Sequence, residues 1–214
     1  MKAKGFTLAE VLITITLLGI IAILGIPALL TNMQKAKAGP ALMRAISILD
    51  NANSMMFVEQ DMYDFSETCY GDDHAGYVTH CFVPFIQENI GAAQDNQTII
   101  YQPFKNSVGN AITLSGGYAN KNGFTYYFMP PGDAEGIFLY IDINGNSSPN
   151  EIGKDLFAAY ISYEQNGKVI PAASRIDPNA PEGWVHKCDV SGVTDALTCA
   201  GSISDNGGKV IYPW

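Results

Sequence analysis

Lys4-Gly5-Phe6-Thr7-Leu8-Ala9-Glu10 stands directly before Val11–Leu30, a run of twenty residues without a charged side chain. Twenty helical residues rise about 30 Å, which is the thickness of the hydrocarbon core of a bilayer. This run therefore predicts a membrane-spanning helix. Glu10 lies at the edge of the run, where an ionised side chain is costly, so it marks a functional site. Thr7 with Glu10 three residues later has the pattern of a capping box, which predicts that the helix begins near Thr7.

The segment from Gly5 to Val11, with the apolar run to about Leu30, resembles the N-terminus of the type IV pilin-like family. This family comprises pilins and the pseudopilins of type II secretion and DNA uptake. The resemblance covers roughly the first seventh of the chain. It implies that a prepilin peptidase removes residues 1–5, that Phe6 is N-methylated, and that an inner-membrane assembly platform builds the mature chain into a filament of pilin-like subunits. A signal-anchor helix is the competing interpretation. It is disfavoured because a secretory signal has its small-residue cut site after the apolar core, whereas Gly5 precedes it.

Phe6 and Glu10 are predicted to act together once the leader is removed. The cut gives Phe6 a new α-amine, which is charged near neutral pH. A carboxylate buried among apolar helices without a partner costs on the order of several kcal/mol. We therefore predict that Glu10 pairs with the amine of Phe6, on a neighbouring subunit or on the same one, and that this pair sets the register of assembly.

The pattern predicts one long helix over about residues 7–59. Its apolar half, about 7–30, would cross the membrane and later form the filament core, and three residues interrupt it: Gly19, Gly25 and Pro27. They indicate either a harmless kink in a membrane helix or, as the resemblance implies, a segment that stretches or melts on assembly; the residues do not decide between the two. Beyond Leu30 the pattern becomes amphipathic, so this half should pack on the head. Gly39-Pro40 is expected to bend the helix or to begin a new segment.

Residues 60–214 are predicted to form an extracytoplasmic head. Five stretches rich in aromatic and β-branched residues predict strands: Thr98–Tyr101, Ala111–Leu114, Phe124–Met129, Gly136–Ile141 and Asp155–Tyr163. Asn166-Gly167 predicts a hairpin turn and therefore an antiparallel sheet. The apolar patch Phe82–Ile86 predicts a short helix under the head domain. The predicted fold class is thus α+β, with a long N-terminal helix packed on an antiparallel sheet, and the resemblance implies that this fold is pilin-like.

Four cysteines fall into two local pairs, Cys69 with Cys81 and Cys188 with Cys199. An even number at short spacing favours disulfides in an oxidising compartment, each stabilising the fold by roughly 3 kcal/mol. A zinc site is disfavoured because the C-x-x-C spacing is absent. The cysteines therefore predict that the head lies outside the cytoplasm, and the resemblance implies a single-pass protein of the inner membrane. Its final location would be a periplasmic pseudopilus or a cell-surface pilus.

The composition disfavours nucleic acid as a partner. The chain has 12 basic and 21 acidic residues, a net charge of −9. Loss of Lys2 and Lys4 with the leader would leave 10 basic residues and a net charge of −11. Such a chain repels polyanions, so no nucleic-acid binding is expected, and membrane lipid surrounds only the apolar helix before assembly.

Oxygen-bearing side chains at alternate positions give one candidate metal loop: Asp142, Asn144 and Asn146, with Asp155 beyond. The spacing is similar to the start of a calcium-binding loop, but Gly145 comes two places early and Gly153 occupies the place of the bidentate acid. A plain turn built on Asx hydrogen bonds is the favoured interpretation. A structural calcium ion remains the alternative, because the resemblance implies that some secretion pseudopilins carry a calcium-stabilised loop near their sheet.

The chain has no G-x-S-x-G, H-E-x-x-H or glycine-rich phosphate loop, so it is predicted not to be an enzyme. We predict a structural subunit of a type IV pilus or of a type II secretion pseudopilus. Two alternatives stay open. One is a membrane-anchored binding protein, adhesin or enzyme with an uncut helix, and the other is an adhesive minor pilin. The residues do not distinguish pilus from secretion or DNA uptake, or a major from a minor subunit.

Overall fold

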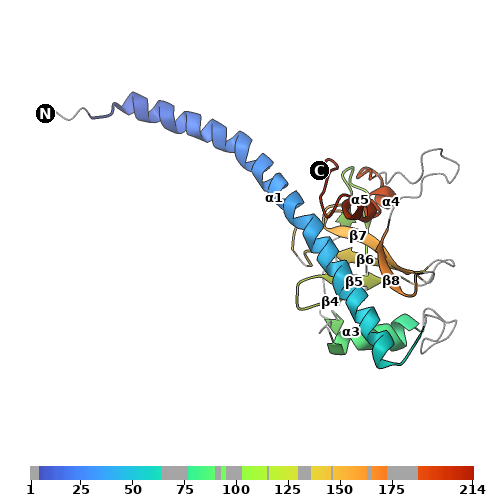
Figure 1. Ribbon diagram of the computed structural model, residues 1–214. Coiled ribbons are helices and arrows are strands. Elements are labelled where there is room, and N and C mark those ends of the chain that lie inside the picture. Colours follow the sequence, from blue (N-terminus) through green and yellow to red (C-terminus); the bar gives the residue numbers. More distant parts are fainter. Residues whose placement is uncertain are drawn as a thin grey trace.

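The computed structural model describes residues 5–63, 77–89, 93–94, 103–114, 116–129, 136–145, 147–162, 165–172 and 188–214. Its dominant element is helix α1, Leu8–Glu59, which confirms the single long helix that the sequence predicts. Figure 1 shows the C-terminal half of α1 lying along the head and the N-terminal half extending away from it. Pro27 and Pro40 both lie inside α1, so no new segment begins at Gly39-Pro40.

Short helices and eight strands follow α1 in the described part of the head. The helices are the π-helix η2 (Tyr77–Phe82), α3 (Val83–Asn89), α4 (Val193–Leu197) and α5 (Cys199–Asp205). The strands are β1 (Ala93–Gln94), β2 (Phe104–Lys105), β3 (Ala111–Ile112), β4 (Tyr118–Ala119), β5 (Thr125–Phe128), β6 (Gly136–Asp142), β7 (Leu156–Ser162) and β8 (Lys168–Pro171). Helix α3 confirms the short helix predicted from the Phe82–Ile86 patch.

The main sheet has the strand order β1-β4-β5-β6-β7-β8, and every neighbouring pair is antiparallel. The predicted hairpin joins β7 to β8, and both Asn166 and Gly167 have positive φ, at 52° and 76°. Strands β2 and β3 form a separate two-stranded sheet. The predicted strand Ala111–Leu114 is therefore present as β3 but belongs to this smaller sheet, and Thr98–Tyr101 lies outside the described residues.

The sheet is covered on both faces, as the alternation along β7 shows. Phe157, Ala159 and Ile161 belong to the core between the sheet and α1. Leu156 and Ala158 belong to a second cluster, which includes Phe104 of β2, Leu114 and the α4 residues Ala196 and Leu197. Alternate side chains of a strand point to opposite faces, so α1 covers one face while the small sheet and α4 cover the other.

The head-facing side of α1 has the spacing of an amphipathic helix. Leu42, Leu49 and Met56 are fully buried and recur every seven residues, with Ala45 and Ala52 buried between them. A stripe at this spacing keeps one face of a helix on the core. The structure thus confirms that the half of α1 beyond Leu30 packs on the sheet.

Two contacts that the sequence does not reveal hold α1 in place. The hydroxyl of Tyr126 on β5 donates to the carbonyl of Ala45 at 3.3 Å and accepts from Nδ2 of Asn120 at 3.1 Å. A Cβ placed on Gly39 would overlap the carbonyl oxygen of Gly208, in the turn after α5. The glycine therefore lets the C-terminal segment lie directly on the backbone of α1.

Candidate functional site

The capping box predicted at the start of α1 is present. Thr7 is the N-cap residue, and its Oγ1 accepts a hydrogen bond from the backbone N–H of Glu10 at 3.3 Å. In return, Oε2 of Glu10 accepts from the backbone N–H of Thr7 at 2.8 Å and from its hydroxyl at 2.9 Å. Gly5 and Phe6 precede the helix and are exposed, Phe6 by 87%. The Gly5–Phe6 peptide bond therefore lies outside the helix and within reach of a second protein.

The N-terminal half of α1 presents an uncovered apolar surface. Every Leu, Ile and Val between Leu8 and Leu30 is exposed, the least of them by 48%. The most apolar window of α1 has a mean hydropathy of 2.6 and no buried residue, and length and composition would let it cross a membrane. Thr14 and Thr16 donate their hydroxyls to carbonyls of the preceding turn, so no hydroxyl in this stretch needs water. A continuous apolar surface of this size requires lipid or other apolar helices around it.

Gly19, Gly25 and Pro27 lie within this exposed half, and α1 stays helical through all three. Nothing lies within 4 Å of a Cβ built on either glycine. Pro27 has no N–H, so one carbonyl of the preceding turn lacks its usual donor. Whether these residues are a harmless kink or a segment that stretches or melts on assembly therefore stays a prediction.

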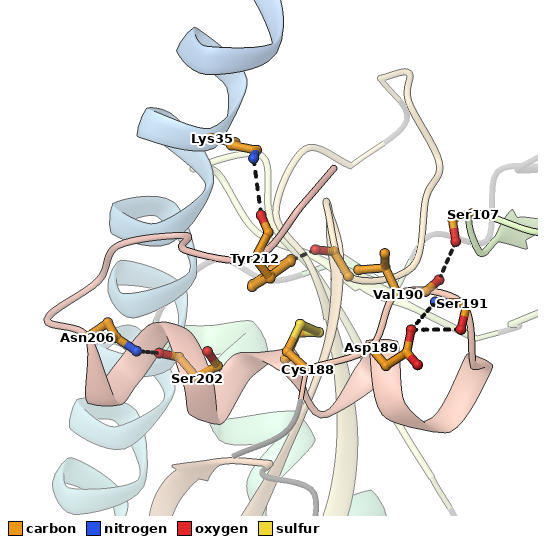
Figure 2. Close-up of a disulfide and its surroundings, with 11 residues drawn as sticks. Lys35, Ser107, Cys188, Asp189, Val190, Ser191, Ser202, Asn206 and Tyr212 are labelled. Carbon is orange, nitrogen blue, oxygen red and sulfur yellow. Dashed lines mark hydrogen bonds between the residues drawn. A yellow bond between two sulfur atoms is a disulfide. The ribbon is translucent and has the colours of Figure 1, made fainter. Parts of the chain in front are cut away.

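The disulfide predicted near the C-terminus joins Cys188 to Cys199, and Figure 2 shows it beside α5. Cys81 is also disulfide-bonded, while its predicted partner Cys69 lies outside the described residues. Cys199 is the first residue of α5 and is fully buried, so the bond ties the C-terminal helix to the segment that precedes it.

The candidate metal loop joins β6 to β7 and contains two buried carboxyl groups, Asp142 and Asp155. Oδ1 of Asp142 accepts from the N–H groups of Asn144 and Gly145, both at 3.0 Å, which confirms the predicted Asx turn. Oδ1 of Asp155 accepts from the N–H of Glu151 at 2.7 Å. Burial raises the pKa of Asp142 to about 7; burial, with the charge of Asp142 adding to it, raises the pKa of Asp155 to about 8. Both carboxylates therefore lack adequate charge compensation.

The same loop has orphaned oxygen atoms. Oδ1 of Asn144 and Oδ1 of Asn150 are buried and have no hydrogen-bond partner within the described part of the chain. Nδ2 of Asn144 donates to Oδ2 of Asp155 at 3.2 Å and to the carbonyl of Pro149 at 3.1 Å, so the amide lies among oxygen atoms. Asn146 lies outside the described residues, and the described residues contain no cluster of three or more His, Cys, Asp or Glu side chains. The donor set is made of oxygen alone, which suits Ca²⁺ and not a transition metal.

Residues 1–26 match the family model of the prokaryotic N-terminal methylation motif. This motif is the signature of type IV pilins and pseudopilins, so the N-terminus of the chain carries that signature. The long apolar helix and the separate antiparallel sheet are consistent with an α+β, pilin-like fold. No curated protein and no solved structure matches the chain. The match covers the leader, Phe6, Glu10 and the first turns of α1.

Proposed function

We propose that the chain is a non-enzymatic structural subunit of a type IV pilus or of a type II secretion pseudopilus. A prepilin peptidase would cut between Gly5 and Phe6, Phe6 would be N-methylated, and α1 would then join a core of like helices. The observation that carries the proposal is the exposed apolar half of α1, which begins at the methylation motif.

The energetics of this surface explain why assembly needs Glu10. Exposing one Leu or Ile to water costs about 1.5–3 kcal/mol, so residues 8–30 must stay covered at all times. Lipid and a bundle of apolar helices cover them about equally well, so apolar burial alone gives little preference for the filament. Glu10 can provide that preference, because an isolated carboxylate is costly in either setting and a paired one is not.

The capping box supports this role for Glu10. Before the cut, the Glu10 carboxylate accepts two hydrogen bonds from Thr7, the residue that follows Phe6. The cut creates a charged amine one residue before that N–H, so the new cation arises close to a carboxylate already turned toward the start of the helix. Pairing within the subunit would neutralise Glu10 in lipid, and pairing with a neighbour would fix the axial register of the filament.

Comparing Glu10→Gln with Thr7→Ala tests the proposal. Thr7→Ala removes the N-cap side chain and keeps the charge of Glu10. Glu10→Gln removes the charge and keeps an oxygen that can accept from the N–H of Thr7. We expect the mature wild-type chain to lack residues 1–5 and to carry one added methyl group by mass spectrometry. Sheared filaments should fall at least tenfold for Glu10→Gln and much less for Thr7→Ala. An intact leader on the wild-type chain would instead favour a membrane-anchored protein with an uncut helix, and equal filament yield from both variants would remove the role of Glu10.

The location follows from the same features. The methylation motif and apolar helix fit an anchor in the inner membrane. The Cys188–Cys199 disulfide supports a head on the oxidising side, outside the cytoplasm. We infer that the head faces the periplasm before assembly and stands on a periplasmic pseudopilus or cell-surface pilus afterwards.

We also propose that the loop between β6 and β7 binds a structural calcium ion. Two buried carboxyl groups of raised pKa and two orphaned amide oxygens support this, since a divalent cation would satisfy all four groups. Lys154, the basic residue beside the loop, pairs with Glu151 instead. Asp142, Asn144, Asn150 and Asp155 would hold the ion.

Thermal unfolding of the full chain in detergent tests this second proposal. Calcium at a hundredfold excess over its dissociation constant should stabilise the folded state by about 2.7 kcal/mol, and EGTA should reverse the effect. Asp155→Asn should abolish the response. Asp61→Asn is the matched control, because Asp61 is an exposed aspartate in a left-handed conformation that asparagine tolerates. An unfolding midpoint that calcium and EGTA leave unchanged would contradict the proposal.

A further inference from the structure

The charged side chains of α1 beyond Leu30 are separated by sign along the helix. Basic residues come first and acidic residues follow: Lys35, Lys37 and Arg44, then Asp50 and Glu59. Asp61 lies two residues beyond the end of the helix. Figure 1 shows this stretch of α1 running from the end of the head near the C-terminal residue to the end near α3. One end of the head therefore carries the bases of α1, and the far end carries its acids.

The far end of α1 has an exposed acidic patch, which comprises Val58, Glu59 and Asp61. Val58 is 82% exposed. Both acids are exposed, and their side chains form no ion pair or hydrogen bond within the described part of the chain. The last turn of α1 has no basic residue, so the negative end of the helix dipole repels these carboxylates. Asp50 and Lys168 line a groove nearby and balance each other in charge, so the acidic patch keeps its negative charge.

The opposite end of the head has an exposed basic patch, which comprises Lys37, Lys209 and Ile211. Lys209 follows Gly208, whose carbonyl lies against the backbone of α1, so the two lysines are on the same side of the head. Both lysines are exposed, and neither forms an ion pair with another described residue. Ile211 is 65% exposed. Asp205, the acid closest to this patch in sequence, already has an interaction of its own.

The charged groups behind the basic patch are already matched. A cavity of about 300 Å³ beside Lys37 is lined by residues that include Lys154, Asp155 and Trp214. Lys154 is ion-paired with Glu151. Asp155 is buried and accepts a hydrogen bond from the N–H of Glu151. The positive charge of the patch therefore comes from Lys37 and Lys209 on the outer surface, and the cavity adds none.

The acidic and basic patches lie at opposite ends of the head, so they cannot meet within one chain. Glu59 follows Lys37 by 22 residues, a rise of about 33 Å. A contact between two different patches of identical subunits repeats without closing and generates a filament. The inference rests here on the proposed function, in which pairing of Glu10 with Phe6 of a neighbour offsets adjacent copies by about 6 Å. Copies about five or six steps apart would therefore bring one acidic patch level with one basic patch.

We propose that the acidic patch of one copy binds the basic patch of a second copy of this chain in the next turn of the filament. Glu59 and Asp61 would gain the cations that the end of α1 lacks, and the two lysines would gain anions. A small ion would leave Val58 and Ile211 exposed, whereas a second copy lets these side chains cover each other. Charged pairs of this kind are individually weak and provide specificity, and the filament repeats the contact at every subunit.

Charge reversal in the full chain tests the contact. Glu59→Lys and Lys37→Glu should each lower the yield of sheared filaments at least threefold, because each change brings like charges together. Both changes in one chain should restore the yield to within twofold of the wild type, because the signs are then exchanged. Lys121→Glu, at an exposed lysine outside both patches, is the matched control and should leave the yield unchanged. Single variants that assemble normally, or a combined variant that assembles no better than they do, would overturn the proposal.

Chemical crosslinking detects the same contact without reversing a charge. The described cysteines are all in disulfides, so introduced cysteines would react alone with a short bis-maleimide. Intact filaments that carry Glu59→Cys and Lys37→Cys in one chain should give a ladder of multimers, and each change alone should give none. Filaments without this ladder would overturn the proposal, as would products whose mass is not a multiple of this chain. A wild-type chain that keeps its leader or forms no filament would instead contradict the proposed function, and this contact with it.

Discussion

The two halves of α1 form one continuous helix and meet opposite surroundings. Between Leu8 and Leu30 every large apolar side chain is exposed, whereas Leu42, Leu49 and Met56 are fully buried against the sheet. The difference lies in the pattern: the first half is apolar all round, and the second half is apolar on one face. The first half therefore depends on partners outside the chain, and the second half determines how the head folds. Stability of the head and assembly of the subunit should be separable by mutation along a single helix.

The largest expected effect comes from the same substitution in each half. Leu49→Ala removes a fully buried side chain and should lower the free energy of unfolding by about 2–5 kcal/mol. Leu18→Ala changes a side chain that is 65% exposed and should leave head stability within about 0.5 kcal/mol. Denaturant unfolding of the full chain in detergent measures both. Similar losses for the two variants would show that the halves unfold together and would break the comparison.

The Cys188–Cys199 disulfide tests whether the head can be destabilised without affecting the exposed half of α1. Its cysteines are 11 residues apart, so closing the loop should stabilise the head by about 3 kcal/mol in the chain-entropy model. Replacing both with alanine should lower the unfolding midpoint of the head and leave the helicity of residues 8–30 unchanged. Circular dichroism would measure the helicity, and an unfolding probe in the head would measure the unfolding midpoint. A loss of helicity in the anchor half would contradict the division.

Local signals account for most of what the sequence predicts correctly. Helix α1, its capping box at Thr7, the β7–β8 hairpin at Asn166-Gly167 and the Cys188–Cys199 bond all depend on residues close in sequence. Periodicity also predicts the antiparallel sheet. The sequence predicts the strand at Ala111. It does not predict that this strand pairs with the one at Phe104 in a separate sheet, because pairing depends on which strand edge is free in the folded head.

Contacts between distant parts of the chain are missed for a physical reason. The sequence pattern predicts a bend or a new segment at Gly39-Pro40, whereas in the structure Gly39 lets Gly208 approach the backbone of α1. The cavity beside Lys37 likewise needs Trp214 from the far end of the chain. Neither residue spacing nor composition in the sequence predicts such contacts. The candidate loop at Asp142 is intermediate: its turn is local and predictable, and the burial of its carboxyl groups is not.

The glycines of α1 give the next prediction. Gly39→Ala would place a Cβ against the Gly208 backbone, so the C-terminal segment must shift, at a cost of about 1–3 kcal/mol. Gly25→Ala meets nothing within 4 Å and should cost the head nothing. It should also strengthen the helix slightly, since alanine is favoured over glycine by about 1 kcal/mol. Unfolding of the two variants in detergent provides the measurement. A stable Gly39→Ala variant would show that the close contact with Gly208 is dispensable.

The smallest effect concerns the hydrogen bond that holds the buried half of α1 to β5. Tyr126→Phe keeps the ring and removes the hydroxyl that donates to the carbonyl of Ala45 and accepts from Asn120. We expect a loss of about 0.5–1.5 kcal/mol, with the Asn120 amide left short of one partner in a buried site. Tyr118→Phe is the matched control, because Tyr118 pairs with Tyr126 across β4 and β5, and its hydroxyl makes no hydrogen bond in the described part of the head. If both variants lose equally, the hydrogen bonds of the Tyr126 hydroxyl add nothing specific, and the packing of Leu42, Leu49 and Met56 fixes α1 against the sheet.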